Sequence, residues 1–191
     1  MNNLNALRDE VFAINKGNGW HEEKRSYGEL IALVHSEVSE ALEDYRNGKA
    51  VNKVWYEYKN QDGSIDNVSG FIRNGVLGKP CGIPSELADI VIRILDICGL
   101  HTWDIEDYMD TKGSISFSLK DLSFVELLTE IHSYLSYSYQ ELGYYRILAL
   151  CHAIQTVDYI CNQNNINLEE IIRVKLEHNK TRGYKHGGKV I

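Results

Sequence analysis

The chain has 191 residues, of which 43% are hydrophobic, and a formal net charge of -7 at pH 7. This length and apolar content are enough for one packed domain, and the acidic balance argues against sequence-independent binding to nucleic acid. No stretch is apolar for long enough to span a bilayer, and the N-terminal MNNLNALRDEVF lacks the features of a secretory signal. We therefore expect a cytoplasmic protein with no nucleic-acid or membrane partner.

The four cysteines also indicate a cytoplasmic location. They include no C-x-x-C pair, and three of them lie in apolar helical runs, where a free thiol behaves as a small hydrophobic side chain. A structural zinc site is therefore not expected, and reduced buried thiols suit the cytosol.

Hydrophobic periodicity predicts an all-α protein, in which a helical bundle forms the domain. In chain order, helices are expected at about residues 4–15, 27–46, 84–99, 101–113, 121–142, 145–161 and 167–179. Residues 47–83 carry turn residues and scattered aromatics, which predict a long loop of the kind that is often functional or mobile.

The later half of the chain repeats the earlier half. LIALVHSEVSEA (30–41) aligns without gaps on LLTEIHSYLSYS (127–138), and DICGLHTWDIED (96–107) aligns on YICNQNNINLEE (159–170). A duplicated helical unit explains both alignments, whereas chance similarity between amphipathic helices is the alternative. We expect one domain over 1–191, with a metal-binding repeat at 1–112 and a degenerate repeat at 113–191. The aligned His35 and His132 project outward on their helices and are expected at the surface or at an interface.

Two pairs of acids are present in the first repeat and missing from the second: Glu37 with Glu40, and Glu86 with Asp89. At about 100° per residue, each pair shares or borders the apolar face of its helix. Like charges three residues apart are unfavourable without a cation. Two such pairs on facing helices would form a cage of hard oxygen ligands suited to Mg²⁺ or Mn²⁺.

Two other interpretations of the acids remain. An E-x-x-E pair is also typical of a solvated helix face. A di-iron carboxylate bundle would need an E-x-x-H motif on each of two helices, and the sequence contains no such motif.

Three blocks of sequence resemble a known family. KGNGWHEEKRSYGELIALVHSEVSEALEDYRNGK, PSELADIVIRILDICG and KLEHNKTRGYKHGGK are similar, in this order, to the MazG-like nucleotide pyrophosphohydrolases of the all-α NTP pyrophosphatase superfamily, and they cover a little under half of the chain. The resemblance implies that Glu37, Glu40, Glu86 and Asp89 bind Mg²⁺. It also implies that a nucleoside triphosphate is split into its monophosphate and pyrophosphate. Family members commonly build their core from two subunits; an internal copy could supply those helices in cis, as in the all-α dUTPases.

The resemblance maps a phosphate-binding motif onto Lys175, Asn179 and Arg182, with Lys185 following. Such a set can contact the oxygens of an anionic triphosphate, and arginine can do so with two hydrogen bonds. The alternative is a basic helix end that favours the helix dipole. Trp20 precedes the first acidic helix and is a candidate for stacking on a base, or equally a core or interface anchor.

The sequence therefore predicts a Mg²⁺-dependent nucleotide pyrophosphohydrolase, with Mn²⁺ as a possible substitute and Glu37 or Glu40 as the general base. A homodimer is expected. The alternative function is a non-catalytic helical module that binds a protein partner through a tyrosine-rich surface such as SYLSYSYQELGYYR (133–146).

Overall fold

The computed structural model describes residues 3–110 and 119–184. The described chain is mainly helical, and its helices are α1 (Leu4–Gly17), α2 (Tyr27–Arg46), α3 (Ile83–Leu100), α4 (Ile105–Asp110), α6 (Phe124–Gln140), α7 (Gly143–Gln163) and α8 (Leu168–Thr181). Each of these lies within a few residues of a predicted helix. None of the helices in the described part of the chain is long and apolar enough to cross a bilayer.

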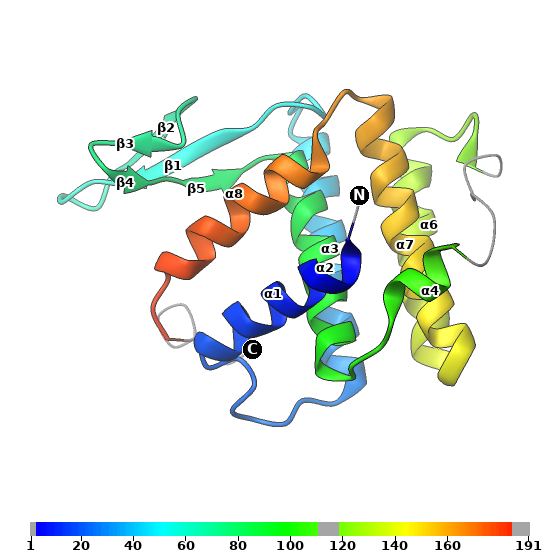
Figure 1. The fold of residues 1–191 in the computed structure, drawn as a ribbon. Helices are drawn as coiled ribbons and strands as arrows, with labels where there is room; N and C mark the ends of the chain where they lie inside the picture. The colour runs from blue at the N-terminus through cyan, green and yellow to red at the C-terminus, as the bar shows by residue number, and fades with distance from the viewer. Residues whose placement is uncertain (1–2, 111–118, 185–191) are drawn as a thin grey trace.

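Helix α3 is the centre of the domain. It packs against α1, α2, α7 and α8, while α6 packs against α2 and α7 (Figure 1). Because α3 is apolar on almost all sides, most of its residues are buried, as the sequence predicts for a helix enclosed by others. Its acids are therefore held on a rigid element in the interior.

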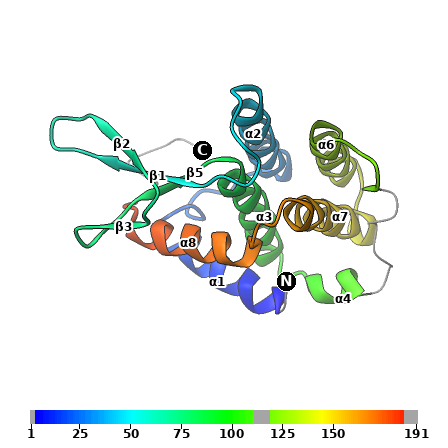
Figure 2. The ribbon, with the colours of Figure 1, turned by 90° about the horizontal axis from the view of Figure 1, so that it is seen from above.

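The prediction of a long loop at residues 47–83 is wrong, and the fold is consequently not all-α. This segment contains a three-stranded antiparallel sheet, in the order β2-β1-β5, and a separate β3-β4 hairpin. The strands are β1 (Trp55–Lys59), β2 (Ile65–Val68), β3 (Ile72–Arg73), β4 (Val76–Leu77) and β5 (Lys79–Cys81). Figures 1 and 2 both show the sheet projecting from one side of the helices.

Local signals for these strands are present in the sequence. Asn74 and Gly75 both have positive φ, 51° and 77°, and they form the turn between β3 and β4. An Asn-Gly pair between short apolar runs is a strong hairpin signal. The strands were missed because they are short and because the turn residues around them dominate the composition.

The start of α3 is fixed by Gly82. This residue has φ +99°, and a Cβ atom on it would lie 2.5 Å from the backbone oxygen of Lys53. Only glycine tolerates this conformation and this approach, so the chain passes directly from β5 into α3. The junction brings the first turn of α3, with Glu86, next to the sheet.

His35 and His132, expected at the surface or at an interface, lie where α2 and α6 pack together. Their rings stack across the α2–α6 contact with centroids 5.0 Å apart, and their Nδ1 atoms are 2.7 Å apart. Both side chains are half-buried. The helical projection placed each residue away from the apolar face of its helix. The two helices, however, pack against each other through the faces that carry these histidines.

Candidate active site

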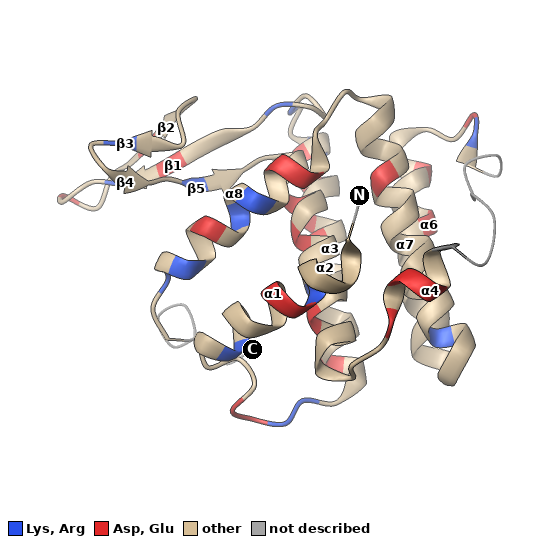
Figure 3. Ribbon diagram, in the orientation of Figure 1, with Lys and Arg blue, Asp and Glu red and all other residues tan. Residues whose placement is uncertain are grey.

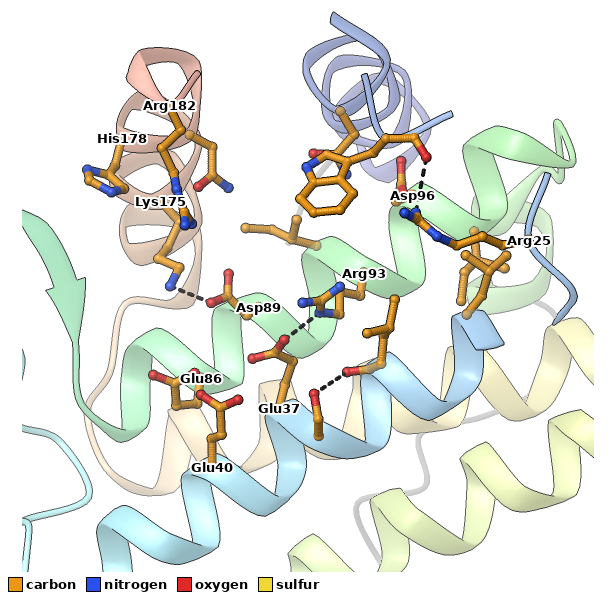
Figure 4. Close-up of a pocket in the computed structure, with 18 of the residues that line it drawn as sticks. Arg25, Glu37, Glu40, Glu86, Asp89, Arg93, Asp96, Lys175, His178 and Arg182 are labelled. Atoms are coloured by element: carbon orange, nitrogen blue, oxygen red, sulfur yellow. Dashed lines mark hydrogen bonds and ion pairs between the residues drawn. The ribbon is translucent and has the colours of Figure 1, made fainter. Parts of the chain in front are cut away.

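Three of the predicted carboxylates converge between α2 and α3 (Figure 4). Glu37, Glu40 and Glu86 each offer an oxygen that lies within 4.8 Å of the other two. Glu37 is buried, with 5% of its surface exposed, Glu86 is half-buried, and Glu40 is exposed. Mg²⁺ holds its oxygen ligands at about 2.0–2.1 Å, so oxygens on one ion lie at most about 4.2 Å apart, and modest side-chain movements would bring these three onto one ion. The donor set is made of hard oxygens and fits Mg²⁺ or Mn²⁺.

The fourth acid, Asp89, forms an ion pair with Lys175 on α8. Lys175 is buried and also donates a hydrogen bond of 2.8 Å to Ser85 Oγ. Burial lowers the pKa of Lys175, but the charges of Asp89 and Glu86 outweigh it and raise the pKa overall. The lysine is therefore charged, and it reaches the acids of its own chain.

Glu37 is paired with a residue that was not among the predicted site residues. Arg93 Nε donates to Glu37 Oε1 at 2.5 Å. Burial raises the pKa of Glu37, with Arg93 opposing this effect and Asp89 adding to it. Arg93 follows Asp89 by one helical turn, so the helical projection that placed the acids on one stripe also places Arg93 there.

Glu86 has no basic partner within hydrogen-bonding distance among the described residues. Burial raises its pKa to about 8; Lys175 opposes the shift, and Asp89, Glu37 and Glu40 add to it. A carboxylate with this surrounding is stabilised in its charged form by an added cation. The acidic cluster is thus only partly neutralised by the protein itself.

The acids line one end of a cavity of about 320 Å³. This volume is at the lower end of the range of about 300–1,000 Å³ for small-molecule sites. Figure 3 shows basic positions on α8 beside the acidic α2–α3 pair. The charged and aromatic side chains that line the cavity besides the four acids are Trp20, Arg25, Lys79, Arg93, Asp96, Lys175, His178 and Arg182.

The structure brings almost all predicted substrate-binding residues to this cavity. Lys175, Asn179, Arg182 and Trp20 line it together with the acids, while Lys185 lies outside the described residues. Burial lowers the pKa of Arg182, and the charge of Asp89 partly restores it. Residues from both ends of the chain therefore meet the acidic pairs.

Trp20 and Arg25 come from the connection between α1 and α2. The Arg25 guanidinium lies 5.1 Å from the centre of the Trp20 ring, and its Nη1 donates to Trp20 O at 3.0 Å. The neighbouring His21 is held in place: its Nε2 lies 2.9 Å from Asp96 Oδ1, and its ring packs 4.7 Å from that of Phe12. His21 is thus used to fix this connection onto α3.

The residues after α8 are held against the same connection. The Tyr184 hydroxyl donates to Glu22 Oε2 at 2.5 Å, and its ring covers Gly19, where a Cβ atom would lie 2.3 Å from the ring. Gly19 has φ +83°, which favours glycine. This contact keeps Arg182, two residues before Tyr184, at the cavity.

His178 is a further lining residue that sequence reasoning missed. Burial lowers its pKa to about 4, and the charges of Arg182 and Lys175 add to the effect. Its Nδ1 is buried without a hydrogen-bond partner among the described residues. A neutral imidazole therefore faces the basic side of the cavity, and only its position one turn from Lys175 and Arg182 could have indicated this.

Comparisons with known proteins add nothing to this geometry. No family model, no curated protein and no solved structure matches the chain.

Proposed function

We propose that the protein is a Mg²⁺-dependent nucleoside triphosphate pyrophosphohydrolase. It would cleave an NTP or dNTP to the nucleoside monophosphate and pyrophosphate. The observation that carries the proposal is that the acids of α2 and α3 share one cavity with the cations of α8. A metal-bound polyphosphate can bridge such carboxylates and several cations. The three sequence blocks around these residues also resemble those of the MazG-like nucleotide pyrophosphohydrolases.

Glu37, Glu40, Glu86 and Asp89 would hold the metal, with Mn²⁺ as a possible substitute for Mg²⁺. A bound divalent cation would neutralise charge on the phosphates and lower the pKa of an attacking water. Glu40 is exposed, so water reaches its carboxylate directly. Glu40 or Glu37 accepts the proton of the attacking water as general base.

Lys175 and Arg182 would bind the phosphate oxygens, Lys175 as a point charge and Arg182 through two parallel hydrogen bonds. Asn179, one turn from Lys175, adds an amide donor from the same face of α8. The phosphates would thus be held between α8 and the acids, which would align the breaking P–O bond of the anhydride between the α and β phosphorus atoms with the attacking water.

We place the nucleoside end of the substrate near Trp20. Asp96, which also lines the cavity, is seven residues along α3 from Asp89, or about 10 Å at the helical rise per residue. This is enough for a sugar and a base beyond the phosphates. Aromatic rings stack on bases of any sequence, which suits Trp20 for that end.

Two structural correspondences support an internal duplication. Ser26 and Glu29 form a capping box at the start of α2, and Ser123 and Glu126 form the same box at the start of α6. The two boxes have the same offset as the alignment of LIALVHSEVSEA on LLTEIHSYLSYS. A shared capping device at matched positions is expected of two copies of one unit.

The ends of α3 and α7 also correspond. Thr102 and Asn165, which the second alignment equates, both have φ 54°. The backbone bonds that follow match as well, from Trp103 N to Cys98 O and from the equivalent Ile166 N to Cys161 O. We propose that 113–191 is a degenerate copy of 1–112, retained for the packing of α6 and α7 against the catalytic helices.

A non-catalytic interaction module is the second candidate function. The observation that favours it is a group of exposed side chains around the α6–α7 turn: Tyr137, Tyr139, Leu142 and Tyr145. Tyrosine is enriched at protein interfaces, and these residues would equally suit the contact of a homodimer.

We also propose a cytoplasmic location, with which the buried free thiols are consistent.

The test is pyrophosphate release from a panel of canonical and modified nucleoside triphosphates with Mg²⁺. Glu40→Gln and Asp89→Asn should abolish release and leave the far-UV spectrum unchanged, whereas Glu43→Gln, which changes an exposed acid on α2, should retain it. Full activity of either site variant would remove the acids from the mechanism. An interaction module would release no pyrophosphate from any substrate.

A further inference from the structure

Arg93 is held at the site by one nitrogen only. Its Nε donates to Glu37, and neither Nη atom has a hydrogen-bond partner among the described residues. The side chain lines the cavity and is 39% exposed, whereas that of Glu37 is 7% exposed. The guanidinium is therefore the more accessible partner of this ion pair, and Glu37 is the more enclosed one.

A second guanidinium lies in the same cavity. Burial is the largest cause of the lowered pKa of Arg182, Asp89 opposes it, and the positive charge of Arg93 adds to it. Two arginines that repel one another across a cavity gain from an anion between them, and each can bind phosphate through two hydrogen bonds. The pair Arg93 and Arg182 thus has the chemistry of a phosphate site.

We infer that Arg93 is an exchangeable counter-ion: it neutralises Glu37 in the metal-free protein and moves to the phosphates of the substrate when a divalent cation binds the acids. A dication beside Glu37 repels the guanidinium, and an anion between Arg93 and Arg182 attracts it, so both changes favour the same movement. This inference rests on the proposed function and adds Arg93 to the residues that bind the triphosphate.

The competing explanation is that Arg93 permanently orients Glu37 as a ligand, as groups behind metal ligands often do. The two explanations predict opposite effects of Arg93→Gln on metal affinity. Removal of a competing counter-ion strengthens metal binding, whereas removal of a support weakens it.

The experiment measures Mn²⁺ binding from the loss of the free-ion electron paramagnetic resonance signal, without nucleotide. Arg93→Gln should bind Mn²⁺ about three to ten times more tightly than the wild type, as expected for loss of one partly exposed competing ion pair. In calorimetry at saturating Mg²⁺, Arg93→Gln should bind inorganic tripolyphosphate about ten times more weakly than the wild type, because charge-assisted hydrogen bonds are lost. Arg46→Gln, which removes an exposed arginine that pairs with Glu43 on α2, should change neither value.

Unchanged or weaker Mn²⁺ binding by Arg93→Gln would overturn the exchange and leave the proposed function intact. The proposed function has its own control, since Glu40→Gln should bind Mn²⁺ much more weakly than the wild type. If Glu40→Gln and the wild type bind Mn²⁺ equally well, both the metal site and the exchange are rejected. If Arg93→Gln does not fold, Arg93→Lys keeps the charge without the planar fork; it should bind Mn²⁺ normally and tripolyphosphate more weakly, and normal tripolyphosphate binding would overturn the inference.

Discussion

Replacing Lys175 with methionine tests how the acidic site is held together without metal. The substitution keeps an unbranched apolar stem but removes the charge that pairs with Asp89 and the donor to Ser85. Breaking a fully buried ion pair costs about 3–5 kcal/mol. The Asp89 side chain is 21% exposed, and Ser85 Oγ keeps its hydrogen bond to Pro80 O. We therefore expect Lys175→Met to lower the free energy of unfolding by about 2–3 kcal/mol.

Urea denaturation in the presence of a chelator measures this loss. The double variant Lys175→Met/Asp89→Asn should regain about half of it, because no unpaired carboxylate is left behind. Arg173→Met, which breaks an exposed pair between Arg173 on α8 and Glu10 on α1, should cost under about 1 kcal/mol. A Lys175→Met protein within about 0.5 kcal/mol of the wild type would refute the buried-pair reasoning.

Two further predictions concern Gly19 and Glu86. Gly19→Ala should destabilise the protein by about 1–2 kcal/mol, because the new Cβ meets the Tyr184 ring at positive φ, whereas Gly17→Ala has open space and should be nearly neutral; equal urea midpoints would contradict the contact. For Glu86, the folded pKa of about 8 lies above the ordinary glutamate value of 4.5, so the folded state binds more protons between these values. Metal-free stability should fall as pH rises through that range. Glu86→Gln should flatten the fall of Tm with pH, and an unchanged slope would argue against a buried acid there.

The placement of the acids could be predicted because it depends on helical periodicity alone. A residue's angle on a helix follows from its number, and α3 is buried on nearly every side, so Glu86 and Asp89 were bound to be at least partly buried. The same reasoning gave the bounds of α2 to the residue. The motif resemblance assigned the C-terminal cations to phosphate binding, but their contact with the acids of the same chain depends on how α8 packs on α3, which periodicity does not contain.

The parts that were missed depend on contacts between distant segments. The partners of Glu37 and His35 are set by how α2 lies against α3 and α6, and a projection of one helix carries no information about its neighbour. The small sheet was missed because two- to five-residue strands give too few alternations to outweigh the surrounding turn residues. Periodicity puts Arg93 on the same stripe of α3 as Asp89, but it does not contain the link of Arg93 to Glu37, because that link joins two helices.

The central claim is that carboxylates from α2 and α3 and cations from α8 form one site for a metal-bound nucleoside triphosphate. Phosphorus NMR of a mixture of nucleoside triphosphates with the protein and Mg²⁺ tests it in one measurement. We expect monophosphate and pyrophosphate signals to grow together and a chelator to stop them. Triphosphates that stay intact, or that yield diphosphate and orthophosphate, would contradict it.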